Sequence, residues 1–145
     1  MSYSTWHNYG YGICVDDIKT QDVKRMQALL ELAPETKAKI EGWLSELKIK
    51  EPSWDDYMEF DQDFYLGLAT ILKMVIEEAE EICLTACDDY NSVSYLLYQP
   101  MYPWYMDSVD RDLTEEKTAE IFRRYISILT DDPIDIGYQE VENGG

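Results

Sequence analysis

The sequence has 145 residues, of which 30 are acidic and 12 basic, so its formal net charge at pH 7 is −18. A folded surface this negative repels nucleic acid and anionic membranes, and it attracts basic protein surfaces over a Debye length or more. Hydrophobic residues make up 46% of the chain, which is too many for a disordered acidic tail. The composition therefore predicts a folded protein whose partner is a basic surface.

The charge is unevenly distributed along the chain. Residues 1–52 hold seven basic and eight acidic side chains, whereas residues 53–145 hold five and 22. Because the length is typical of one domain, we expect a single domain over residues 1–145 with a near-neutral part and a strongly acidic part. The tail at 142–145 is expected to be frayed.

In the near-neutral part, the pattern predicts one strand followed by two helices. Large and small residues alternate over 9–15, which is typical of a strand. A helix is predicted over 21–32 with Thr20 as its N-cap. A second helix is predicted over 35–48, since Pro34 suits its first turn.

In the acidic part, two helices, a hairpin, a third helix and a strand are predicted. Ser53 and Asp56 have the spacing of a helix cap and open a short helix, and a longer helix follows over 62–78. Alternating apolar residues on both sides of a turn-rich stretch predict a β-hairpin over 81–98. A cap at Asp112 with Glu115 opens a helix that extends to about 129, and the last strand begins at Ile134.

These elements predict an α+β fold with a small, mostly antiparallel sheet. We expect three or four strands, including the hairpin, with about four to five helices packed on one face. No stretch approaches about 18 apolar residues, so no membrane span is predicted. Three cysteines, an odd number, and the absence of a signal-peptide pattern indicate a cytoplasmic protein.

Pairs of acidic residues recur through the acidic part. Residues four apart on a helix rise by about 6 Å, close to the spacing of about 7 Å between phosphates along one DNA strand. A row of carboxylates on a rigid surface can therefore occupy a basic nucleic-acid channel. The plain alternative, a solvated acidic surface that only keeps the protein in solution, stays open.

We predict a partner-binding surface in the first part of the acidic region. Trp54 and Tyr57 are its predicted anchors, since aromatic residues next to acids suit an interface. The alternative, that aromatic residues of this kind close over a minor core, stays open. The predicted electrostatic face comprises Asp55, Asp56, Asp61, Asp63, Glu77, Glu78, Glu80 and Glu81.

No motif predicts catalysis or metal binding. The chain has a single histidine, His7, and no nucleophile elbow, P-loop or dinucleotide fingerprint. The acids at 107–112 lack EF-hand spacing, and Cys14, Cys83 and Cys87 form no CxxC pair, so we expect buried free thiols rather than zinc ligands. We therefore predict no enzyme activity, no metal and no cofactor.

Four blocks of the sequence resemble a group of small acidic proteins encoded on bacterial phages and integrated elements. They are SYSTWHNYGYGICVDD, DDYNSVSYLLYQPMYPW, LTEEKTAEIFRRYISILTDDPIDI and the VENGG ending. That group has no assigned catalytic residues, so none is carried over. The resemblance implies a mobile-element setting, in which small acidic proteins such as the anti-CRISPR proteins inhibit host defence nucleases.

Charge and resemblance together predict a non-catalytic inhibitor in the bacterial cytoplasm. It would block a host nucleic-acid-binding defence protein by nucleic-acid mimicry, without itself binding nucleic acid or a membrane. One alternative is a domain that binds or sequesters a small molecule in a pocket around Tyr102, Trp104 and Arg123 or Arg124. Another is a structural or assembly partner with no inhibitory role, and the oligomeric state stays open.

Overall fold

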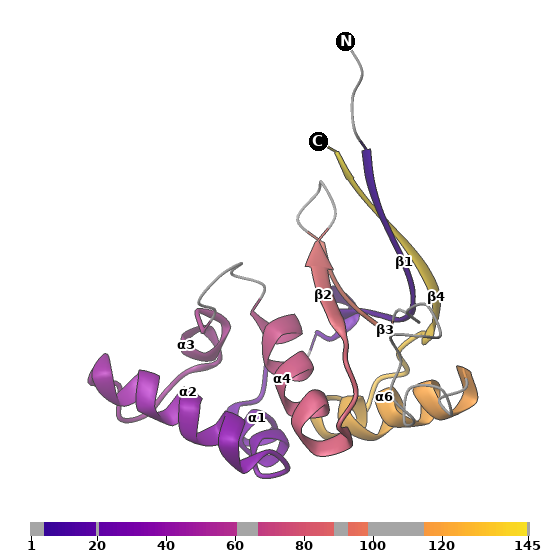
Figure 1. Ribbon diagram of the computed structural model, residues 1–145. Coiled ribbons are helices and arrows are strands. Elements are labelled where there is room, and N and C mark those ends of the chain that lie inside the picture. Colours follow the sequence, from indigo (N-terminus) through magenta and orange to yellow (C-terminus); the bar gives the residue numbers. More distant parts are fainter. Residues whose placement is uncertain (1–4, 20, 61–66, 89–92, 99–114, 145) are drawn as a thin grey trace.

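The computed structural model describes residues 5–19, 21–60, 67–88, 93–98 and 115–144 of the chain (Figure 1). These residues form five α-helices and a four-stranded antiparallel sheet, which confirms the predicted α+β fold. In the described part of the chain, no helix has the apolar length that a membrane crossing demands.

The N-terminal elements are strand β1 (Thr5–Cys14), a 3-10 turn η1 (Val15–Asp17), helix α1 (Val23–Leu30) and helix α2 (Pro34–Glu46). Helix α1 begins later than predicted because Asp22 is its N-cap: the carboxylate accepts the backbone N–H of Lys24 at 2.9 Å. The predicted cap, Thr20, lies outside the described residues. Helix α2 begins at Pro34, where the fixed backbone angle of proline suits a first turn.

Helix α3 (Trp54–Met58) begins with the predicted capping pair. The Oγ of Ser53 accepts the backbone N–H of Asp56 at 3.2 Å, and the Asp56 carboxylate accepts the backbone N–H of Ser53 at 2.8 Å. Helix α4 (Leu68–Glu80) follows Gly67 and ends at Glu81, which has a left-handed backbone with φ of 57°. The predicted beginning of this helix, residues 62–66, lies outside the described residues.

The C-terminal elements are strands β2 (Thr85–Asp88) and β3 (Ser94–Tyr98), helix α6 (Glu115–Leu129) and strand β4 (Gly137–Gly144). β2 and β3 pair antiparallel, which confirms the predicted hairpin. Asp112, predicted as a cap of α6, lies outside the described residues. The prediction of a frayed tail is wrong for residues 142–144, because they pair with residues 5–7 of β1.

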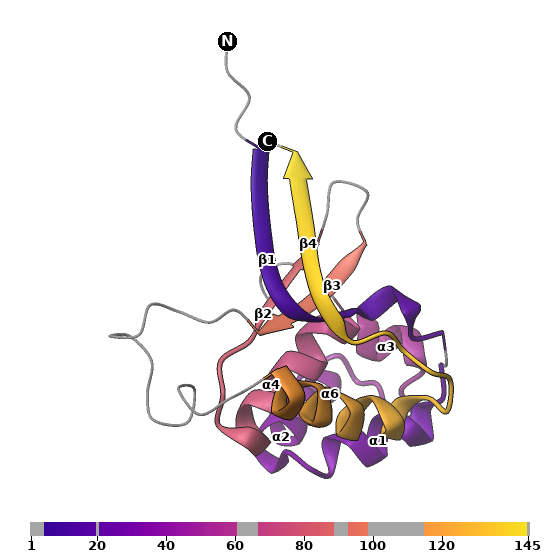
Figure 2. The same ribbon diagram turned by 90° about the vertical axis from the view of Figure 1, so that its right-hand side faces the viewer.

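The strand order of the sheet is β2-β3-β1-β4. β1 pairs with β3 over Tyr11–Cys14 and with β4 over the longer range Thr5–Gly12. Figure 2 shows β1 and β4 rising together away from the layer of helices. The hydrophobic core therefore lies where the C-terminal half of β1 meets the helices.

Gly12 lies where β1 is flanked by both β3 and β4. A Cβ atom at this position would lie 2.0 Å from the backbone oxygen of Leu96. This distance is far below a van der Waals contact, so a side chain here would force the backbone to move. Glycine is therefore the residue that allows β1 and β3 to come this close.

The core joins one face of the sheet to the helices. Ile13 and Leu96, which are register partners on β1 and β3, are both fully buried and belong to the same cluster as residues of α1, α2, α4 and α6. Burial of this apolar material is the main force that opposes the self-repulsion of the acidic chain. The largest fully buried side chains are Phe122, Ile13, Met26, Leu29, Ile40, Ile71, Leu72, Ile76, Leu96, Leu97, Leu129 and Val75.

Candidate functional site

Three of the predicted acidic residues lie at the C-terminal end of α4 and take part in internal hydrogen bonds. The first, Glu78, accepts the backbone N–H of Glu35 at 3.1 Å, and both the backbone N–H and the hydroxyl of Thr36 at 2.8 Å. The residue before α2, Ala33, has no side chain that can cap the helix. Glu78 therefore caps the N-terminus of α2 from a neighbouring helix.

The environment of Glu78 acts on its pKa in two directions. Burial raises the pKa. The hydrogen bonds from Thr36 and Glu35 and the charge of Lys39 lower it, and their combined effect is larger than that of burial. The pKa of Glu78 consequently lies below its ordinary value, so the carboxylate is charged at neutral pH. A charged carboxylate at a helix N-terminus is also favoured by the helix dipole.

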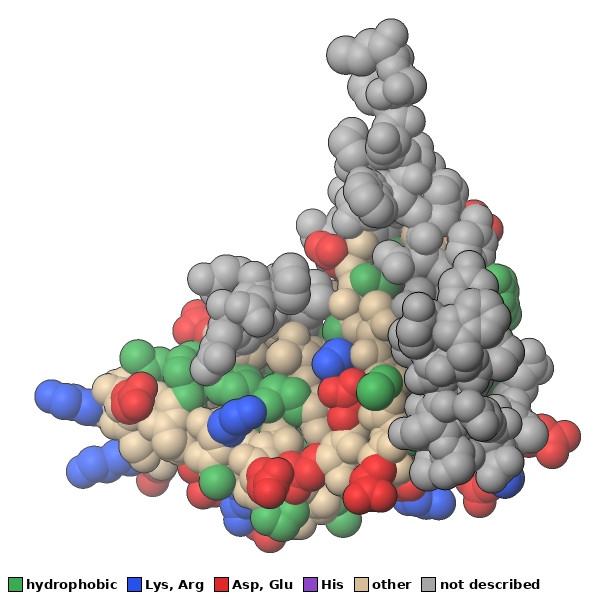
Figure 3. Space-filling view, in the orientation of Figure 1, with side chains coloured by type: hydrophobic (Ala, Val, Ile, Leu, Met, Phe, Trp, Pro, Cys, Tyr) green, Lys and Arg blue, Asp and Glu red, His purple; other side chains and the backbone are tan. Residues whose placement is uncertain are grey.

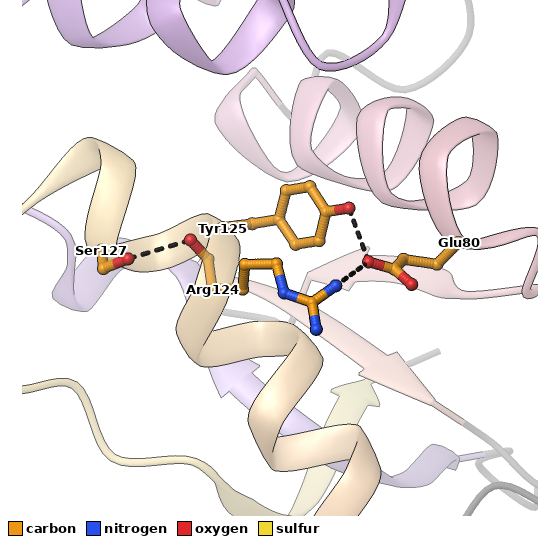
Figure 4. Close-up of polar contacts among 4 residues, drawn as sticks. All are labelled: Glu80, Arg124, Tyr125 and Ser127. Carbon is orange, nitrogen blue, oxygen red and sulfur yellow. Dashed lines mark hydrogen bonds and ion pairs between the residues drawn. The ribbon is translucent and has the colours of Figure 1, made fainter.

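Glu77 and Glu80 connect α4 to two other parts of the fold. Glu77 accepts from the ammonium of Lys73 at 2.9 Å and from the backbone N–H of Leu84 at 2.9 Å, next to the beginning of β2. Glu80 accepts from the guanidinium of Arg124 at 2.5 Å and from the hydroxyl of Tyr125 at 2.7 Å, both on α6 (Figure 4).

The contact with Glu80 has a consequence for Tyr125. Burial, the hydrogen bond to Glu80 and the negative charge of Glu80 raise the pKa of Tyr125 to about 12. The phenol therefore stays protonated and donates to the carboxylate. On the same helix, the hydroxyl of Ser127 donates to the backbone oxygen of Arg124 at 2.9 Å (Figure 4).

The residues of the predicted acidic face thus fall into two groups, those with internal contacts and those that are exposed. Glu77, Glu78 and Glu80 are partly buried and hold α4 to its neighbours, and Asp56 closes the capping box of α3. Asp55 and Glu81 are exposed. Asp61 and Asp63 lie outside the described residues.

The two predicted anchors belong to the hydrophobic core. Trp54 is 8% exposed and Tyr57 is 4% exposed, and both pack in the main cluster. They offer little surface for insertion into a partner, and their placement matches the alternative of a core role. Their burial fixes helix α3 to the body of the protein.

Two acidic residues near Asp55 were not among the predicted site residues. Glu51, Asp55 and Glu59 lie at four-residue spacing and are all exposed, and we name them the α3 acidic row. Among the described residues, no ion pair joins any of the three to a basic side chain. Glu51 precedes the extended N-cap Ser53, so only Asp55 and Glu59 have the helical spacing that was predicted for a phosphate mimic.

Charges of both signs appear on the face drawn in Figure 3. Basic side chains gather at the left end, over α2, and acidic ones lie among them and toward the centre. Some opposite charges of the described residues are paired, for example Lys37 with Glu31 and Lys73 with Glu77.

The cysteines do not form a metal site in the described part of the chain. Cys14 and Cys87 share a register with Tyr95 but lie on the two strands that flank β3, which separates them. None of the three cysteines forms a disulfide; Cys14 and Cys87 are half-buried, whereas Cys83 is exposed, so the expectation of buried thiols is wrong for Cys83. Burial and the charge of Asp17 raise the pKa of Cys14, which disfavours its thiolate.

The described residues contain no metal site, and they include only part of the predicted small-molecule pocket. Within the described ranges, no group of three or more His, Cys, Asp or Glu residues is arranged to hold a metal ion. Tyr102 and Trp104, like the acids at 107–112, lie outside these ranges. Arg124 is held by Glu80, whereas Arg123 lines a surface pocket next to α6.

No protein-family model matches the chain, and no curated protein or solved structure is significantly similar to it. The similarity to phage-encoded acidic proteins therefore stays a prediction. Function has to be argued from the charge and geometry of the described residues.

Proposed function

We propose that this protein is a non-catalytic binding protein whose partner is a basic protein surface of the kind that holds nucleic acid. The observation that carries the proposal is the α3 acidic row, three exposed carboxylates of which Asp55 and Glu59 have helical spacing, on a protein of net charge −18. The row would take the place of phosphates in the partner's channel. Nucleic acid itself is repelled by the same charge.

Electrostatics supports both the speed and the strength of such binding. A strongly negative protein is steered toward a basic surface over a Debye length of about 10 Å at 0.1 M salt. When carboxylates take the place of phosphates in a basic channel, ions bound to both surfaces are released, as when nucleic acid binds. Binding is therefore expected to weaken steeply as salt is added.

The buried aromatic residues contribute to this function indirectly. Trp54 and Tyr57 hold one side of α3 in the core, and the capping box of Ser53 and Asp56 fixes its first turn. Asp55 and Glu59 are therefore presented on a short helix that is already held in place. A surface that is ordered before binding loses less conformational entropy when it binds.

The more specific form of the proposal is an inhibitor from a phage or mobile element that blocks a host defence nuclease, in the manner of anti-CRISPR proteins. This form is supported by the sequence resemblance, and by the high negative charge that a nucleic-acid mimic needs. It places the protein in the bacterial cytoplasm, where such nucleases act.

Charge reversal tests the assignment of the α3 acidic row. The double variant D55K/E59K is compared with E41K/E46K, which changes two exposed glutamates of α2 and gives the same net charge. We expect the α3 variant to bind the partner captured from bacterial lysate at least about tenfold more weakly than the α2 variant, because like charges at a basic contact repel. Affinities are measured by calorimetry, and circular dichroism verifies that both variants are folded.

Equal losses in the two variants would show that only net charge matters, and would contradict the role of the α3 acidic row. Unchanged affinity in both variants would contradict the whole proposal.

A further inference from the structure

β4 is an edge strand whose second side pairs with no described strand. The order β2-β3-β1-β4 places β1 next to it (Figure 2), and β2 comes near it without forming a ladder. An edge strand presents backbone N–H and C=O groups that can pair with another extended chain. Proline, which would remove such a donor, does not occur in Gly137–Gly144. β4 therefore has the backbone groups that a further strand needs.

The side chains of β4 alternate between an open and a covered face. Tyr138 is 68% exposed and Glu140 is also exposed, whereas Val141 is 1% exposed. Successive side chains of a strand point to opposite faces, so Tyr138 and Glu140 lie on the same face. A strand added to β4 would place its own side chains opposite these two.

Tyr138 ends a row of tyrosines that crosses the sheet. Tyr98 on β3 and Tyr138 on β4 are both register partners of Tyr11 on β1. Along this row Tyr98 is buried, Tyr11 is half-buried and Tyr138 is exposed. Tyr138 is also more exposed than Leu32 and Leu47, the other exposed large apolar residues of the described ranges. The row thus reaches solvent at the edge, where the ring of Tyr138 can contact a residue of an added strand.

The charge around β4 favours an added strand that is basic. Residues 125–145 contain no lysine or arginine, and their acidic residues are Asp131, Asp132, Asp135, Glu140 and Glu142. Antiparallel pairing of β4 with a second copy over most of its length would place Glu140 opposite Glu140 or Glu142 of that copy. Because like charges directly opposite each other destabilise a sheet, a second copy is disfavoured and a basic strand is favoured.

We propose that an extended protein segment with lysine or arginine at alternate positions pairs with β4 as a fifth strand of the sheet. Its backbone forms ladder hydrogen bonds with the outer side of β4. One basic side chain forms an ion pair with Glu140, and another lies on the ring of Tyr138, because a cation is attracted to an aromatic face. This site is separate from the α3 acidic row and does not depend on the proposed function.

The peptide acetyl-Thr-Lys-Val-Arg-Val-Lys-Thr-amide tests the proposal by calorimetry at about 150 mM salt. In a strand, the amides of alternate residues point to opposite sides, so only one set faces β4. Two N-methylated forms are compared, one methylated at the basic residues and the other at the valines. We expect one form to bind at least about tenfold more weakly than the parent peptide, and the other within about threefold of it.

Three results of the peptide experiment would overturn the proposal. Equal binding of the parent and both methylated forms would show that charge alone holds the peptide. Equal losses in the two forms would show that the peptide does not pair through one side of a strand. No binding of the parent peptide at millimolar concentration would show that β4 does not accept such a strand.

Two variants of β4 locate the contact on the protein. E140K and Y138S are each expected to bind the peptide about fivefold more weakly, because each removes one cross-strand pair. The controls E116K and L47S change an exposed glutamate of α6 and another exposed large apolar residue. Losses as large in the controls would show that the peptide binds elsewhere and would contradict the site.

Two further measurements separate this site from other surfaces and from a second copy. D55K/E59K is expected to bind the peptide as E41K/E46K does, and a loss confined to D55K/E59K would place the peptide at the α3 acidic row instead. Analytical ultracentrifugation of the protein alone should show no self-association that depends on Tyr138. A dimer that dissociates in Y138S would assign the edge to a second copy and overturn the proposal.

Discussion

Gly12→Ala is expected to destabilise the protein by about 3 kcal/mol or more, or to prevent folding. The new Cβ would lie 2.0 Å from the backbone oxygen of Leu96 and 3.0 Å from the Cα of Leu97. Because both contacts involve the backbone of β3, no change of side-chain rotamer relieves them. The strands have to move apart at the point where the sheet meets the core.

Gly42→Ala is the matched control for this prediction. A Cβ at Gly42 meets no atom within 4 Å, and the residue lies within α2. Alanine favours the helix, so this variant is expected to gain about 0.5–1 kcal/mol. Chemical denaturation of the two variants gives the difference directly. Similar stabilities of the two variants would contradict the claim that β1 and β3 approach too closely at Gly12 for a side chain.

Glu78→Ala is expected to lower the free energy of unfolding by about 2 kcal/mol. The substitution leaves three donors at the beginning of α2, from Glu35 and Thr36, without their acceptor. Glu46→Ala, at an exposed position of the same helix that Glu78 caps, is expected to change stability by less than about 0.5 kcal/mol. Equal effects of the two variants would contradict the capping role.

The capping role of Glu78 also predicts how the stability difference between the parent protein and Glu78→Ala depends on pH. The pKa of Glu78 is lowered in the folded state, mainly by hydrogen bonds that outweigh the effect of burial. Its stabilisation is therefore complete above the unfolded pKa of about 4.3 and is lost as the pH falls through the folded pKa. Denaturation at pH 7 and pH 3 should show that the difference between the parent protein and Glu78→Ala narrows at the lower pH.

Most of the fold could be predicted because its signals are local. The apolar spacing of α1, α2, α4 and α6, and the turn residues between β2 and β3, act within a few residues of each other. The capping pair of Ser53 and Asp56 is likewise contained in four residues. The tail was predicted to fray because it lies at a chain terminus, whereas residues 142–144 pair with β1, which is distant in the sequence.

The candidate site was harder to predict because acidic residues in similar sequence patterns are partly buried in one case and exposed in another. Glu78 and Asp55 look alike in the sequence, but Glu78 faces the beginning of α2 only after the two helices pack. Trp54 and Tyr57 gave a signal that was not used: with Met58 they recur at helical spacing on one side of α3, a pattern typical of a core face. That pattern leaves Asp55 and Glu59 on the side exposed to solvent.

The claim that the protein takes the place of nucleic acid is tested most directly by capture from bacterial lysate. The tagged protein is incubated at about 100 mM and about 500 mM salt, with and without duplex DNA as competitor. The proposal predicts that a nucleic-acid-binding protein is captured at the lower salt, lost at the higher salt and displaced by DNA. A partner that is retained at both salt concentrations and unaffected by DNA, or the absence of any specific partner, would contradict it.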